Sequence, residues 1–244
     1  MLLRTIFSAL FGAVLFAAAG DKPLWSQGFE DRVAGQPPVG WGVKWGDQGD
    51  DLVIVSNLRA ASGSRSLLFD RTGDNTAMWG TATGFPSVKS GWAHLSCAFL
   101  VQGAGHDARF GFEIREAAPA QRRVAALRFG GSKVGVIPMS ESGGYLDKES
   151  VTLGTFAKDV WYRLDLWLPA AGSSDRRGAA QLLRYAGAGS WEPLGAPWAL
   201  PLVAPAATSG YGQLMYVATP GARGYRLFLD DLQLTAATAL PETK

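Results

Sequence analysis

Four side chains at alternate positions of one segment combine the chemistry that sugar recognition needs. Trp161 and Trp167 are aromatic, and between them lie Arg163 and Asp165. Successive side chains of a β-strand point to opposite faces, so in a strand these four share one face. A sugar presents apolar C–H faces and a rim of hydroxyl groups, which suit a flat ring and charge-assisted hydrogen bonds. The pattern predicts a glycan-binding face, with Trp167 as its stacking surface.

Two further residues, Trp92 and His94, alternate in the same way and could lie on the same sheet. Aromatic side chains are more often packed than exposed, however, so a second interpretation stays open. In that interpretation the rings pack beneath loops such as Trp191–Pro205, or Trp161 covers the edge of the sheet. The two interpretations differ in which rings reach solvent.

Catalytic signatures are weak. A retaining glycosidase needs two carboxylates about 5–5.5 Å apart. Glu113 and Glu116 are separated by an odd number of positions, so in a regular strand they face opposite ways. A polysaccharide lyase would need Tyr, His and Arg side chains on one sheet, and these types occur without a motif at His94, Arg115, Arg163 and Tyr216. The sequence therefore predicts no catalytic residue.

The segment 160–168 also has an apolar face, formed by Tyr162 and three leucines at alternate positions. Similar segments follow one another, separated by turns that draw on 31 glycines and 13 prolines, as a many-stranded antiparallel protein requires. We therefore predict an all-β fold with two antiparallel sheets packed face to face as a sandwich. The expected strands are 24–31, 51–56, 76–81, 92–101, 109–116, 122–129, 133–137, 151–156, 160–168, 180–185, 211–219 and 225–234, with a further one entered from a tight glycine turn within 61–70.

Three local features carry expectations of their own. Cys97 is the single cysteine and lies between Leu95 and Phe99 on the apolar face of its strand, so it is expected to be buried and inert. The polar loop at 139–150 is long enough to line a groove. The stretch 191–205 is expected to be an irregular excursion.

The first residues have the features of an export signal, with Arg4 before an apolar run and small residues at 17–19. Residues 1–19 are therefore predicted to be a signal peptide, 20–235 a single sandwich domain and 236–244 a flexible tail. The mature protein would be periplasmic or extracellular, without a membrane association. With 23 basic and 21 acidic residues, the chain has no basic stripe that would favour nucleic acid.

Several short motifs resemble known domains. They are Phe29-Glu30-Asp31, Pro38-Val39-Gly40-Trp41, Ser62-Gly63 before Ser66-Leu67, Trp161-Tyr162-Arg163-Leu164 and Phe228-Leu229-Asp230-Asp231. Together they are similar to concanavalin A-like and laminin-G-like jelly-roll domains of exported bacterial proteins and to carbohydrate-binding modules. The resemblance implies a jelly-roll fold and a glycan or polysaccharide as the partner.

The resemblance also implies a structural calcium ion where the first and last strands meet. Glu30 and Asp230 are the positions that match, and calcium favours several carboxylate and carbonyl oxygens. In the alternative, the two carboxylates accept backbone N–H bonds. Asp47, Asp50 and Asp51 form a weaker acidic cluster whose spacing fits no calcium loop. No other cofactor is expected.

These observations predict an exported carbohydrate-binding β-sandwich protein without evident catalytic residues. The site would consist of Trp167, Arg163, Asp165, Trp161, Trp92 and His94. Two alternatives remain open. One is a polysaccharide lyase or glycoside hydrolase on the same jelly-roll scaffold, and the other is a protein-interaction module of the cell envelope.

Overall fold

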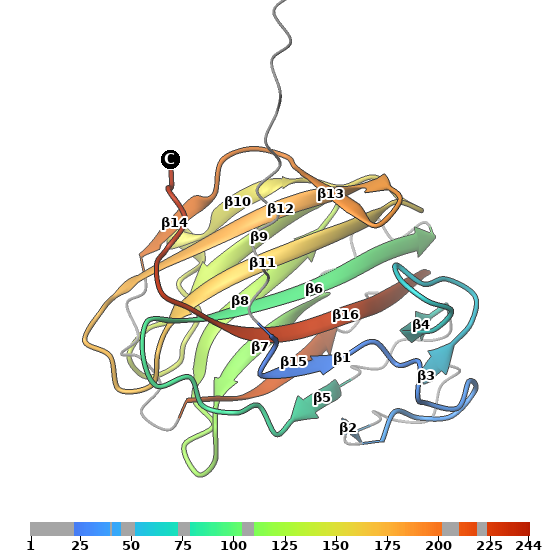
Figure 1. Cartoon of the computed structure of the whole chain (residues 1–244), viewed down its shortest axis with the longest axis horizontal. Helices are drawn as coiled ribbons and strands as arrows, with labels where there is room; N and C mark the ends of the chain where they lie inside the picture. The colour runs from blue at the N-terminus through green and yellow to red at the C-terminus, as the bar shows by residue number, and fades with distance from the viewer. Residues whose placement is uncertain are drawn as a thin grey trace, which may run out of the picture.

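Two antiparallel β-sheets lie against each other in the computed structural model of the chain (Figure 1). It describes residues 22–39, 41–44, 52–72, 79–103, 110–201, 210–218 and 224–244. Across these residues the helical structure is one short 3-10 turn, η1 (Asp147–Glu149). No helix of the described part is long and apolar enough to span a membrane. The predicted all-β antiparallel sandwich of jelly-roll type is confirmed, while the signal segment and the Asp47–Asp51 cluster lie outside the described residues.

The first sheet, which we call sheet A, contains the segment with the alternating tryptophans. Its strands are, in spatial order, β13 (Ser190–Pro193), β12 (Arg177–Gly187), β11 (Trp161–Pro169), β6 (Trp92–Gly103), β16 (Tyr225–Ala237), β4 (Ser66–Arg71) and β3 (Leu52–Ser56). Two short strands lie off this path: β1 (Trp25–Gln27) pairs with β16, and β14 (Trp198–Pro201) pairs with β12. The first and last strands of the domain are therefore neighbours, as expected.

The second sheet, sheet B, forms the opposite layer. Its order is β10 (Val151–Thr155), β9 (Lys133–Pro138), β8 (Arg123–Gly130), β7 (Phe110–Glu116), β15 (Tyr211–Ala218), β5 (Trp79–Thr83) and β2 (Trp41–Lys44). Four of these strands, β7 to β10, follow one another along the chain as well as in space. The connection between β9 and β10 is the polar loop 139–150, and this loop lies next to the outer face of the sheet, where Tyr145 contacts Glu113 of β7.

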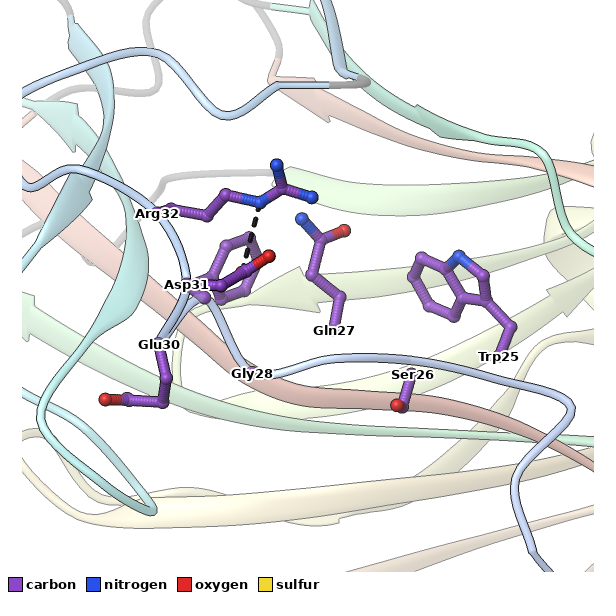
Figure 2. A pocket seen from close by; sticks show the side chains of 8 residues that line it. Trp25, Ser26, Gln27, Gly28, Glu30, Asp31 and Arg32 are labelled. Carbon is purple, nitrogen blue, oxygen red and sulfur yellow. Dashed lines mark ion pairs between the residues drawn. The ribbon is translucent and has the colours of Figure 1, made fainter.

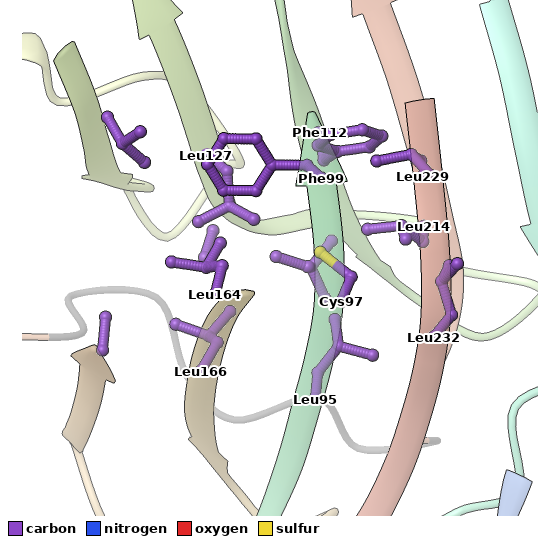
Figure 3. Packing of buried hydrophobic residues seen from close by; sticks show 14 of the residues in the cluster. Leu95, Cys97, Phe99, Phe112, Leu127, Leu164, Leu166, Leu214, Leu229 and Leu232 are labelled. Carbon is purple, nitrogen blue, oxygen red and sulfur yellow. The ribbon is translucent and has the colours of Figure 1, made fainter. Parts of the chain in front are cut away.

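The core lies between the two sheets and follows the alternation that the sequence shows. Tyr162, Leu164, Leu166 and Leu168 of β11 are all buried in it. Figure 3 shows Leu164 and Leu166 beside Leu95, Cys97 and Phe99 of β6, with Phe112 and Leu127 of sheet B packed against them. Each such side chain contributes about 1.5–3 kcal/mol by leaving water, so this layer fixes which face of β11 points outward.

Cys97 is buried between Leu95 and Phe99, as predicted. Burial raises the pKa of its thiol to about 12, and the charge of Asp165 acts in the same direction. A thiol with so high a pKa is not ionised at neutral pH and is a poor nucleophile. The residue therefore acts as a small apolar side chain of the core.

Three of the differences from the sequence-based expectations lie in sheet A. The stretch 191–205 is not entirely irregular, because it contains part of β13 and all of β14, which extend sheet A. The first strand ends at Gln27, two residues before Phe29 takes a positive φ of 62° and turns the chain. The last strand continues to Ala237, and beyond it the backbone N–H of Lys244 donates to the carbonyl of Pro197.

Candidate functional site

The outer face of sheet A carries the side chains that the sequence singled out. In the pairing of β11 with β6, Trp167 lies opposite His94, and Asp165 lies opposite Ser96. Because directly paired residues share a face of the sheet, the register places His94, and two positions before it Trp92, on the same face as Trp167. The expectation that β6 and β11 contribute to one surface is confirmed.

Trp161 is not part of the open surface, so the expectation of an exposed indole is wrong for this residue. It is 9% exposed and belongs to a small apolar cluster with Leu100 and Phe228 on the outer side of sheet A. Tyr185 and Trp191 pack against this cluster, because the β12–β13 hairpin brings them over it. Trp161 therefore contributes to packing beneath the stretch 191–205, the alternative that the sequence left open.

Asp165 is buried and engaged in contacts within the protein. Its Oδ2 accepts hydrogen bonds from Nη2 and Nε of Arg163, at 2.9 and 3.2 Å. Its Oδ1 lies 3.3 Å from Nε2 of His94, although the two atoms are not aligned for a hydrogen bond. The Arg163 guanidinium also lies 5.7 Å from the ring centre of Trp191. Arg163 therefore pairs with one oxygen of Asp165, while the buried Oδ1 accepts no hydrogen bond.

Trp167 and His94 form a stacked pair, with ring centres 4.4 Å apart and planes within 2° of parallel. One face of the Trp167 ring is therefore covered. Trp92 is half-buried and donates its indole N–H to the carbonyl of Arg177 at 3.3 Å. On this face the rings that were expected to receive a sugar mostly contact protein.

The C-terminal tail further restricts access to sheet A. It leaves β16 and crosses in front of β11 and β12 toward β14 (Figure 1). At its end, the Lys244 ammonium lies 4.0 Å from the ring centre of Trp198, and the Lys244 N–H donates to Pro197 at 3.0 Å. None of Trp25, Trp41, Trp92, Trp161, Trp167, Trp191 and Trp198 falls in the exposed class.

Sheet B, by contrast, has a groove on its outer face. Arg128 of β8 is paired with Gly111 on one side and Gly135 on the other, so no side chain stands beside it on either neighbouring strand. The groove has a volume of about 290 Å³. Its lining consists of Arg128, Gly130, Lys133, Gly135, Ile137, Asp147, Ser150, Val151 and Thr152. The polar loop 139–150, which was expected to line a groove, supplies two of these residues.

A cluster around Glu113 lies next to this groove. Glu113 is 2% exposed, and its two oxygens accept hydrogen bonds from Nε of Arg115 at 2.9 Å, from Nε of Arg123 at 2.8 Å and from the hydroxyl of Tyr145. Burial by itself would raise the pKa of Glu113, but these bonds outweigh it and hold the pKa below its usual value. Glu113 therefore stays charged and orients three side chains.

Tyr145 belongs to the exposed class, with 40% of its surface accessible. The guanidinium carbons of Arg123 and Arg128 lie 5.3 and 5.8 Å from its ring centre. Because Arg128 also lines the groove, the ring stands at the edge of that space. No local pattern of the sequence marks Glu113, Arg123, Arg128 and Tyr145 as a group, since they come from three separate segments.

A second hollow, of about 380 Å³, lies along residues 25–32. Figure 2 shows Glu30 pointing away from the ion pair between Asp31 and Arg32. Every residue that lines this hollow belongs to one continuous segment, so no second element faces a ligand across it. We assign no site there.

Both carboxylates predicted to hold calcium accept backbone N–H bonds. Glu30 Oε1 accepts from Ser64 at 2.9 Å, and Asp230 Oδ2 accepts from Ala61 at 2.8 Å and from Ser62 at 3.2 Å. These N–H groups compete with a cation for the same lone pairs. Among the described residues, no group of three or more His, Cys, Asp or Glu side chains could hold a metal ion. The calcium site stays a prediction.

The residue types that a lyase would need are not brought together. His94 and Arg163 lie on strands of sheet A, whereas Arg115 and Tyr216 lie on strands of sheet B. A core of apolar side chains separates the two sheets. The set His94, Arg115, Arg163 and Tyr216 therefore does not form one site.

Comparison with known proteins agrees with this fold. No family model and no curated protein matches the sequence. Among solved structures, the carbohydrate esterase of the Shiga toxin-encoding bacteriophage phi24B is similar with a TM-score of 0.55 and 14% identity, over 89% of this chain and 100% of its own.

Two further solved structures show the same likeness. The PL-14 alginate lyase from Aplysia kurodai has a TM-score of 0.55 and 10% identity, over 88% of this chain and 100% of its own. The carbohydrate recognition domain of Emp47p has a TM-score of 0.52 and 10% identity, over 83% of this chain and 91% of its own. At these identities the likeness shows a shared jelly-roll sandwich fold.

Proposed function

We propose that this protein is an exported glycan-binding module and that its binding site is the groove on the outer face of sheet B. The observation that carries the proposal is the groove itself, about 290 Å³ in volume, whose lining residue Arg128 lies 5.8 Å from the centre of the exposed ring of Tyr145. Ligand sites are concave and combine apolar surface with a few directed polar groups. Val151, which is partly exposed, supplies apolar surface, and Arg128, Asp147 and Ser150 supply polar groups.

The solved structures support a glycan as the partner. Their names describe a carbohydrate esterase, an alginate lyase and a carbohydrate recognition domain. A shared fold does not determine the activity, so the choice between binding and catalysis rests on this chain's own side chains. We propose no nucleic-acid partner, because the charges of the chain are balanced.

The side chains beside the groove favour binding over a lyase or hydrolase reaction. A catalytic tyrosine works best when its pKa lies near the working pH. Burial, together with the hydrogen bond to Glu113, instead raises the pKa of Tyr145 to about 12. Glu113 is itself enclosed by two arginines and Tyr145, which leaves it poorly placed as a general acid or base.

The proposal can be tested by blocking each face in turn. A β-carbon at Gly130 would meet no atom within 4 Å, so Gly130→Leu places a side chain in the groove without strain. We expect Gly130→Leu to lower the affinity for soluble polysaccharides about tenfold or more in affinity electrophoresis, while Trp167→Ala leaves it unchanged. The reverse result would move the site to sheet A.

Two other results would overturn the proposal. If no polysaccharide in the gel slows the migration of the wild-type protein, glycan binding is excluded for the sugars used. If incubation with the same polysaccharides releases reducing ends or unsaturated products, the protein is an enzyme on the same scaffold.

A further inference from the structure

The charges around the groove on sheet B are not balanced, unlike those of the whole chain. Four cationic side chains gather on this face: Arg115, Arg123, Arg128 and Lys133. Two carboxylates face them, those of Glu113 and Asp147. Among these six side chains there are two more positive than negative charges, and two of the four cationic side chains, Arg128 and Lys133, line the groove.

The ion pairs on this face differ in how far they are buried. Glu113 is buried and serves both Arg115 and Arg123, so one carboxylate is shared by two guanidinium groups. Arg128 pairs with Asp147 at 2.7 Å, but both side chains are largely open to solvent, at 41% and 61% exposure. A pair this exposed contributes little and exchanges readily for another anion.

Lys133 is the most available of the four. It is exposed at the first position of β9 and lines the groove. No ion pair among the described residues includes it. Lysine carries three rotatable donors on a flexible stem, while the guanidinium of Arg128 matches a carboxylate or sulfate with two parallel donors. The two side chains border the same groove and are suited to one anionic group.

We infer that the groove selects glycans that carry anionic groups, carboxylates or sulfates, and that Arg128 and Lys133 recognise the charge while the ring of Tyr145 contacts the sugar face. This inference rests on the proposed function and deepens it. Complementary charge raises specificity and the rate of association more than it raises total affinity. Binding should therefore weaken as the ionic strength rises.

The test compares glycans that differ in charge but share a backbone. Polygalacturonate is paired with its fully methyl-esterified form, and dextran sulfate is paired with dextran. We expect the charged member of at least one pair to bind about tenfold more tightly than its neutral partner, and the favoured pair identifies the anion as a carboxylate or a sulfate.

Variants then connect this preference to the groove. Lys133→Gln and Arg128→Gln should each reduce the preference for the charged glycan about three- to tenfold. Arg184→Gln removes the same charge from an exposed position of β12 on the other sheet and should leave the preference unchanged. Circular dichroism and the thermal transition show whether each variant is folded.

The outcomes separate this inference from the proposed function. If charged and neutral glycans bind equally and Gly130→Leu abolishes both, the groove binds glycans and the anionic preference is overturned. If polyglutamate competes as well as polygalacturonate, the face attracts any polyanion, and the inference also fails. If no glycan of either kind binds, the proposed function itself fails.

Discussion

Glu113 accepts hydrogen bonds from three side chains while almost fully shielded from solvent. Removing its charge would leave Arg115 and Arg123, which are 16% and 35% exposed, without their shared partner. Loss of one member of a buried ion pair costs about 3–5 kcal/mol. Because these arginines retain some solvent, we expect Glu113→Gln to lower the free energy of unfolding by about 2–3 kcal/mol.

Urea unfolding followed by circular dichroism gives this value directly. Arg184→Gln, at an exposed position that takes part in no ion pair among the described residues, serves as the matched control and should leave the transition where it is. If Glu113→Gln is equally neutral, the cluster has no role in holding Tyr145 beside the groove.

Asp230 makes stability depend on pH in an unusual direction. Burial raises its pKa to about 7, and the charge of Asp231 adds to this, while the N–H groups of Ser62 and Ala61 act in the opposite sense. The unfolded chain loses the same proton near pH 3.8. Between these values the folded state holds more protons, so its stability falls as pH rises from about 4 to about 7.

We expect Asp230→Asn to remove this slope from a plot of unfolding free energy against pH. Asp175→Asn is the matched control, because hydrogen bonds from Arg177 lower the pKa of Asp175 to about 2. Its stabilising effect is lost as pH falls from about 4 to about 2, so its removal should not alter the interval from 4 to 7. An unchanged slope in Asp230→Asn would show that the backbone N–H bonds keep Asp230 ionised.

At the scale of elements, β13 acts as a cover for the outer side of β11. Trp191 and Tyr185 pack over the cluster that contains Trp161. We expect Trp191→Ala to expose Trp161, shift the tryptophan emission to longer wavelength and lower the unfolding free energy by about 2 kcal/mol, less than for a fully buried tryptophan. Leu194→Ala removes an exposed side chain just after β13 (46% exposed) and should do neither.

The burial of a strand's inner face could be predicted from the sequence, whereas the packing of the β12–β13 hairpin over its outer face could not. Leu164 and Leu166 were assigned to the core because alternation within one strand decides which face is buried, and that is a local property. The cover over Trp161 depends on where the following hairpin folds back, which no local pattern encodes. The cluster beside the groove joins Glu113 to Arg123 and Tyr145, which are 10 and 32 residues away. Only the pairing of β7 with β8 and the path of the loop 139–150 after β9 bring these residues together.

Over the whole molecule, the two sheets present unlike outer surfaces. Sheet A carries the stacked pair of Trp167 and His94 and lies behind the tail, whereas sheet B carries the groove. From β16 to β14 the tail crosses four strand intervals of about 4.8 Å each, roughly 19 Å in all. The seven residues 238–244 can span about 23 Å when extended, so the tail is nearly taut and its end contacts fix its path.

Ending the chain after Ala237 therefore tests which surface binds. The tail contributes one backbone hydrogen bond and a contact of Lys244 with Trp198, each worth about 1 kcal/mol or less at an exposed site. We expect the shortened protein to unfold cooperatively with a loss of about 1–2 kcal/mol. Its affinity for glycans should equal that of the full chain, because the groove lies on the other sheet. A gain in affinity that Trp167→Ala then abolishes would instead place the site on sheet A, beneath the tail.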